Sequence, residues 1–144
     1  MRRPICSLCV VFVFVGFWLP LMAGIYEDGM QLASRNQYKE ASLKLKEFID
    51  KSSNDKRVMD ARFTLAEMFL ASGSILEAAT VYESVLTNNP TEAQDMKARV
   101  QTAKCLEARG EFDRAISKYK EFIRKYRDKK DIHATWLYIA KVYR

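Results

Sequence analysis

The sequence predicts an all-α fold, namely a right-handed α–α solenoid of about three and a half helix–turn–helix units. The first observation is that small residues recur with a period of 37 residues in two series. These are Gly29, Ala66, Ala103 and Ala140 in one series, and Ala41, Ala78 and Ala115 in the other. The second is that apolar residues recur three and four residues apart, as on one face of an α-helix. The third is that no alternating apolar and polar stretch, which would indicate a β-strand, follows the first 23 residues.

Residues 1–23 have the parts of a secretory signal peptide. The basic start MRRP precedes an apolar run of fifteen residues, Ile5 to Leu19, which a proline and small residues follow. We expect cleavage after Ala23. The alternative is an uncleaved membrane anchor, because Ile5 to Ile25 is just long enough to span a bilayer. In both cases we expect residues 24–144 to be exported, tethered to the membrane if the leader is not cleaved, and to form one repeat domain.

The repeat domain divides into units of two helices each. The predicted units are residues 24–54, 55–91, 92–128 and, as a partial unit, 129–144. The second helix of a unit is clearest in GEFDRAISKYKEFIRKY, residues 110–126. Its apolar face consists of Phe112, Ala115, Ile116, Tyr119, Phe122, Ile123 and Tyr126. We expect this face to pack into the stack and the charged side of the helix to be solvated.

The turns carry local signals of their own. A first helix is predicted over Glu92 to Ala108, and Gly110 follows it as a residue suited to the left-handed conformation that ends helices. Pro90 is expected to stop the helix before it. Two capping boxes are predicted at helix starts, formed by Ser74 with Glu77 and by Thr91 with Gln94.

These motifs resemble the tetratricopeptide repeat, whose pattern is W-x2-L-G-x2-Y, then A-x3-F, then P. Unit two matches with Leu65-Ala66-x2-Phe69, Ala78-x3-Tyr82 and Pro90, and the last segment matches with Trp136-x2-Ile139-Ala140-x2-Tyr143. The resemblance implies that the motif residues Ala66, Ala78, Ala103, Ala115 and Trp136 are structural, since small side chains let helices approach closely.

The 37-residue period exceeds the usual 34 of the family. In this the chain resembles two groups of exported bacterial envelope proteins: the BamD-like outer-membrane-assembly lipoproteins and the periplasmic protein that accompanies the Tol-Pal system. The BamD-like group carries a lipidated cysteine directly after its leader. Residues 20–28 contain no cysteine, so we do not expect lipid attachment here.

The resemblance also implies that the first helices line a concave groove for an extended or helical segment of a partner protein. Placed from the small residue of each motif, the groove positions are Tyr26, Met30, Phe63, Glu67, Leu70, Val100, Lys104, Glu107, Leu137 and Lys141. They form an apolar strip with charges of both signs. An alternative role for each of these residues is to pack against the neighbouring helix. Few residues of an interface carry most of its energy, so we do not expect every groove residue to contact the partner.

The sequence contains no catalytic template, so we do not expect an enzyme. His133 is the only histidine and has no cysteine or acid set at metal-ligand spacing, so neither a metal nor a cofactor is predicted. Cys6 and Cys9 form a CxxC inside the apolar leader, which favours apolar filler over redox chemistry. Cys105 is then the single thiol after the leader and cannot form an internal disulfide.

The charge of the chain does not predict a nucleic-acid partner. The formal net charge is +6, and it is +4, from 22 basic and 18 acidic residues, without Arg2 and Arg3 of the leader. This excess is small and mixed in sign, whereas nucleic-acid binding needs a strong basic patch.

These features predict a non-catalytic scaffold for protein–protein interaction in the bacterial cell envelope, with outer-membrane or envelope assembly as the kind of role. The alternatives are a protein that binds the membrane surface through basic second helices, an accessory of an envelope enzyme, and a shortened version of a longer repeat protein. The last helix is apolar nearly all round, so self-association through Trp136 and Tyr143 is a further expectation.

Overall fold

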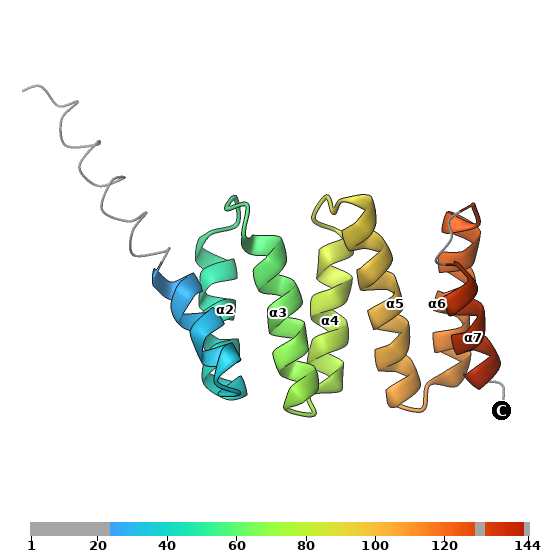
Figure 1. Ribbon diagram of the computed structural model, residues 1–144, viewed down its shortest axis with the longest axis horizontal. Helices are drawn as coiled ribbons and strands as arrows, with labels where there is room; N and C mark the ends of the chain where they lie inside the picture. The colour runs from blue at the N-terminus through green and yellow to red at the C-terminus, as the bar shows by residue number, and fades with distance from the viewer. Residues whose placement is uncertain (1–23, 129–131, 143–144) are drawn as a thin grey trace, which may run out of the picture.

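Helices follow one another in a row in the computed structural model, which describes residues 24–128 and 132–142 (Figure 1). A first helix covers residues 24–34, and the helices after it are α2 (Tyr38–Lys51), α3 (Val58–Ala71), α4 (Ile75–Leu86), α5 (Glu92–Ala108), α6 (Phe112–Tyr126) and α7 (Ile132–Val142). No strand occurs in the described ranges. The predicted all-α solenoid is confirmed, as is the helix over Glu92–Ala108. The predictions on the leader and on Tyr143 lie outside the described residues.

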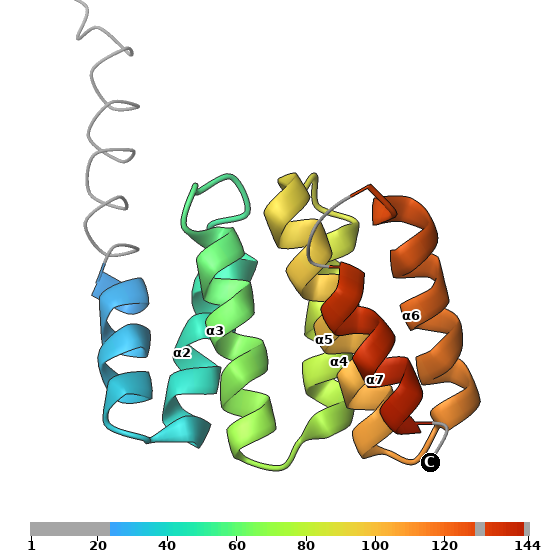
Figure 2. The same ribbon diagram turned by 45° about the vertical axis from the view of Figure 1, so that its right-hand side comes forward.

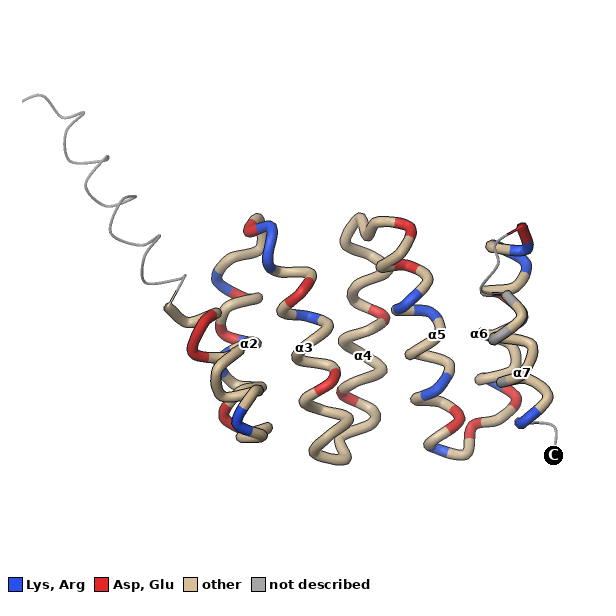
Figure 3. Tube along the Cα trace, viewed as in Figure 1, with Lys and Arg blue, Asp and Glu red and all other residues tan. Residues whose placement is uncertain are grey.

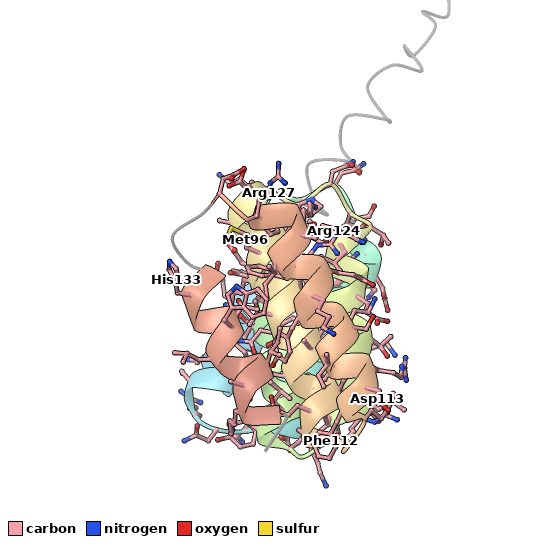
Figure 4. All side chains as sticks on the ribbon, turned by 90° about the vertical axis from the view of Figure 1, so that its right-hand side faces the viewer. Met96, Phe112, Asp113, Arg124, Arg127 and His133 are labelled. Atoms are coloured by element: carbon pink, nitrogen blue, oxygen red, sulfur yellow. The ribbon has the colours of Figure 1, made fainter. Side chains whose placement is uncertain are left out.

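The helices form two layers. Each helix packs mainly against the helix before it and the helix after it (Figures 1 and 2). Seen along the row, α7 lies in one layer and α6 in the other (Figure 4). We call the surface formed by residues 24–34, α3, α5 and α7 the first-helix face, and the surface formed by α2, α4 and α6 the second-helix face.

A left-handed residue ends the first helix of each full unit. Asn36, Gly73 and Gly110 have φ values of 59°, 81° and 76°, and they stand 37 residues apart. The next residue's N–H then bonds to a carbonyl five residues back, as in Ser74 to Phe69 at 2.8 Å. Hydrogen bonds of this kind pair carbonyl groups at the helix end that have no partner within the helix. The predicted conformation of Gly110 is confirmed.

One of the two predicted capping boxes forms. The Thr91 N–H donates to Gln94 Oε1 at 2.9 Å, and the Gln94 N–H donates to Thr91 Oγ1 at 3.4 Å. The prediction of a capping box at Ser74 was wrong, because the Ser74 side chain makes no capping hydrogen bond. Thr91 has the extended backbone of a capping residue, with ψ 162°, whereas the tight turn after Gly73 holds Ser74 at ψ 66°.

The periodic small residues form the contacts between helices. Ala41, Ala66, Ala78, Ala103 and Ala115 are completely buried. Their burial confirms that these five alanines are structural, whereas Ala140, the last member of the first series, is exposed on α7.

Two predicted packing residues are exposed instead. Phe112 is 51% exposed because it begins α6 at the end of the helix pair, where no neighbouring helix covers it. Trp136 of α7 is 53% exposed. The structural roles predicted for these two aromatic residues were therefore wrong.

Candidate functional site

The ten predicted groove residues all come from the first helices of their units. Residues 24–34 supply Tyr26 and Met30, α3 supplies Phe63, Glu67 and Leu70, α5 supplies Val100, Lys104 and Glu107, and α7 supplies Leu137 and Lys141. Glu67, Leu137 and Lys141 are exposed, Phe63 is buried, and the other six are half-buried. The first-helix face thus combines accessible charges with partly covered apolar side chains.

Three ion pairs within the described residues join the first helix of one unit to the start or body of the next first helix. They are Glu27–Arg57 at 3.5 Å, Glu67–Lys97 at 3.2 Å and Glu107–Lys141 at 3.4 Å. In each pair the earlier unit supplies the carboxylate. Because at least one partner of each pair is exposed to solvent, the pairs contribute little to stability, and their main effect is to set the charge pattern of the face.

Cations of the next unit cover the two aromatic groove residues. Lys97 Nζ lies 4.6 Å from the centroid of the Phe63 ring, and the guanidinium of Arg57 lies 4.9 Å from that of Tyr26. Phe63 is only 7% exposed and also packs against Tyr82, with ring centroids 6.1 Å apart. A partner would reach the Phe63 ring only after Lys97 moves, so Phe63 mainly supports the surface above it.

Sequence reasoning missed Arg57 and Lys97 as members of this face. The signal that could have found them is a carboxylate followed thirty residues later by a cation, as in Glu27 with Arg57 and Glu67 with Lys97. That spacing is shorter than the 37-residue period because it joins the middle of one first helix to the beginning of the next.

Glu107 has a structural contact in addition to its ion pair. Tyr119 Oη donates a hydrogen bond to Glu107 at 3.3 Å, which links α6 to α5. Tyr82 stands one period earlier, and Leu70 occupies the place of Glu107 there, so the buried Tyr82 hydroxyl has no hydrogen-bond partner among the described residues. Burial is the main cause that raises the pKa of Tyr82.

The most buried carboxylate of the described structure is Asp95, and it links α5 to α6. It accepts hydrogen bonds from Arg99 Nε at 2.7 Å, from Lys125 Nζ at 3.0 Å and from Tyr126 Oη. Burial alone would raise the pKa of Asp95, but hydrogen bonds from Arg99, Tyr126 and Lys125 lower it to about 2. This cluster is a satisfied ionic contact between two helices, without an open position for a ligand.

Other kinds of site find no support in the described part of the chain. No group of three or more histidine, cysteine or acidic residues there could hold a metal ion. None of the described helices is long and apolar enough to cross a membrane. His133 is exposed near the start of α7, as expected (Figure 4). Basic and acidic residues are both spread over several of the described helices, although α4 carries acidic residues and no basic ones (Figure 3).

Two-helix units stacked in a row, with small residues at each helix contact, define an α-solenoid repeat protein. Two models of the tetratricopeptide repeat family match the chain, one over residues 26–93 and the other over residues 97–129. Together they cover well over half of the chain, which therefore belongs to the tetratricopeptide repeat family. Tetratricopeptide repeats generally form non-catalytic scaffolds that bind other proteins. No curated protein matches the chain at a significant level.

Proposed function

We propose that this chain is a non-catalytic scaffold of the bacterial cell envelope that binds a segment of a partner protein along its first-helix face. The observation that supports this most is the composition of that face. Half-buried apolar side chains such as Met30, Leu70 and Val100 lie among the ion pairs of successive units. Apolar side chains supply affinity for an extended or helical segment, and charges of both signs fix its register.

The envelope location rests on the signal-like leader and on the long 37-residue period, which resembles that of BamD-like and Tol-Pal-associated proteins. Cell fractionation tests it, together with the mass of the recovered chain. We expect a chain that begins at Gly24 in the periplasmic fraction, or an uncleaved chain in the inner membrane. Recovery of the uncleaved chain in the cytosol would contradict the proposal.

Partner binding is tested by co-purification with surface variants of the full chain. Glu67→Lys combined with Leu137→Asp changes two exposed side chains of the first-helix face, so the fold should be unaffected. Leu43→Asp is the matched control, because Leu43 is 69% exposed on α2 of the second-helix face. We expect a partner that co-purifies with the wild type to be lost from the double variant and retained by the control. Equal retention by all three proteins would contradict binding along the first-helix face.

The membrane-surface alternative is not favoured. Most of the positive charge that suggested it lies on α6, and much of that charge is neutralised within the protein. Lys118 pairs with Glu121 at 3.6 Å, Lys125 pairs with Asp95, and Arg114 pairs with Glu111. A helix whose cations are paired in this way offers anionic lipids a weak basic surface.

A further inference from the structure

A cleft of about 540 Å³ lies on the side of α3 that faces away from the first-helix face. Its floor is formed by Arg62, Leu65 and Phe69 of α3, and its walls are formed by residues of α2 and α4. Residues 62, 65 and 69 recur at three and four residues, and they lie on the opposite side of the helix from residues 63, 67 and 70. The cleft therefore opens on the second-helix face, apart from the surface of the proposed function.

The walls of the cleft are mostly apolar. Ile49 of α2 faces Leu76 and Val81 of α4 across the floor. Leu76 is 56% exposed, a large apolar side chain at the opening of the cleft. Such a surface gains free energy when an apolar side chain covers it.

A guanidinium without a carboxylate partner lies in the floor. Arg62 Nη1 donates to Ser84 Oγ at 2.6 Å, while Arg62 Nε is buried and has no hydrogen-bond partner in residues 24–128 and 132–142. Within the described part of the chain, no ion pair includes Arg62. A partly buried cation in this state favours an anion from outside the chain, because a charged hydrogen bond gains strength where water is excluded.

The next unit shows what the same position looks like when it is satisfied. Arg99 stands 37 residues after Arg62, and its partner Asp95 lies four residues before it, one turn away on α5. In unit two the corresponding residue is Val58, so Arg62 lacks this carboxylate.

The apolar walls are also absent from the next unit. The positions of Leu65, Leu76 and Val81 are taken there by Thr102, Asp113 and Lys118. Units two and three both have described helices before and after them. Of these two units, only unit two combines apolar walls with an arginine that has no carboxylate partner.

We propose that this cleft binds a segment of a partner protein in which one acidic side chain is flanked by large apolar side chains. The carboxylate pairs with Arg62, and the apolar side chains cover Leu76, Val81 and Ile49. The rim carries Asp50 and Glu77 as well as Lys46, so a uniformly acidic segment is repelled and a single carboxylate is preferred. This second site does not depend on the first-helix face.

Selection from a phage-displayed library of random 12-residue peptides against the purified full chain tests the proposal. We expect enriched peptides to hold one Asp or Glu within four residues of two large apolar residues. Synthetic versions of these peptides should bind at least tenfold more weakly to Arg62→Gln than to the wild type. Replacing the peptide's acid by its amide should cost the wild type at least tenfold in affinity and should cost Arg62→Gln far less.

Two further variants keep the test independent of folding. Leu76→Gln changes an exposed side chain of the cleft and should weaken binding several-fold, even if Arg62→Gln proved unstable by circular dichroism. Glu67→Gln, on the other side of α3, should leave the affinity unchanged.

Several results would overturn the proposal. They are the absence of any enriched peptide, enrichment of peptides without an acid, and affinity that neither Arg62→Gln nor Leu76→Gln reduces. Tighter binding of decanoate than of every selected peptide would also overturn it, because the occupant would then be a fatty acid. A loss of binding confined to Glu67→Gln would support the first-helix face and reject the cleft, so the two proposals fail separately.

Discussion

Arg62 and Arg99 occupy the same position in successive units, yet only Arg99 has a carboxylate partner, Asp95, at 2.7 Å. Unit two has Val58 at the position where unit three has Asp95. Arg62 of unit two therefore lacks a carboxylate partner, whereas Arg99 of unit three takes part in the contact between α5 and α6. Two sites with different consequences follow from this one difference. The Asp95 contact should control stability, and the Arg62 cleft should control recognition.

The first prediction concerns the Asp95 contact. Asp95→Asn leaves Arg99 and Lys125 facing each other without an anion, in a site where the Asp95 side chain is only 9% exposed. Breaking a buried charged contact on one side is strongly destabilising, and we expect a loss of about 3 kcal/mol in the free energy of unfolding. Urea denaturation measures it. Asp113→Asn, at an exposed residue of the neighbouring helix, should change stability by less than about 0.5 kcal/mol. Equal effects of the two substitutions would contradict this account of Asp95.

The second prediction is the pH dependence of that contact. The pKa of Asp95 is about 2 in the folded chain and about 3.9 in the unfolded chain. Because the folded pKa is the lower one, the stabilisation is fully present above about pH 4 and is lost as the pH falls toward 2. The stability difference between wild type and Asp95→Asn should therefore shrink by about 2 kcal/mol over this range.

The titration of other acidic residues does not affect this difference in stability between the two proteins. Asp55, whose pKa Arg57 also holds at about 2, is common to both proteins, so its contribution cancels in the difference. A difference that stays constant between pH 4 and pH 2 would show that Asp95 does not titrate in this way.

The third prediction concerns the left-handed turn at Gly73. Its φ of 81° is strained for an alanine, although an added Cβ would meet no atom within 4 Å. Gly73→Ala should therefore destabilise the chain by about 1 kcal/mol. Gly73→Asn should cost less, because Asn36 adopts φ 59° at the same position of unit one. Thermal unfolding of both variants decides the order, and an alanine variant as stable as the asparagine variant would contradict the turn argument.

The fourth prediction concerns the exposed pair of the first-helix face. Glu67 and Lys97 are about half-exposed, so Glu67→Gln should change the free energy of unfolding by less than about 0.5 kcal/mol. If this substitution instead destabilised the chain by several kcal/mol, the pair would be structural. It could then no longer be assigned to partner recognition.

The fifth prediction concerns Cys105, which is 2% exposed and forms no disulfide. Burial raises the pKa of its thiol, so little reactive thiolate is available in the folded chain. Mass spectrometry of the peptide that contains Cys105 should show almost no alkylation by iodoacetamide until urea unfolds the protein. Rapid alkylation under native conditions would show that the α4–α5 packing around this thiol opens readily.

The repeat was readable from the sequence because six of its seven periodic small residues, all but Ala140, are buried at the same place in each unit. The left-handed turn at Gly110 was readable for a similar reason, since few residues adopt that conformation. The capping box at Ser74 could not be distinguished from the one at Thr91. Both match the same motif, and only the backbone angles imposed by the preceding turn separate them.

Exposure was harder to predict than helix position. Phe112 and Trp136 lie at correct helical positions, but their burial depends on a neighbouring helix that the pattern of a single helix does not report. The same limit applies to the first-helix face. Its predicted residues come from the expected helices, whereas the cations over Tyr26 and Phe63 come from the next unit and were missed.

The central claim is that a partner protein lies along the first-helix face, and site-specific photocrosslinking in living cells tests it most directly. A photoreactive amino acid is placed at Glu67 or Val100 of the full chain and, as the control, at the exposed Ser117 of α6 on the second-helix face. The proposal predicts that both first-helix positions capture the same partner protein and that Ser117 does not. Capture from Ser117 alone, or from no first-helix position, would contradict it.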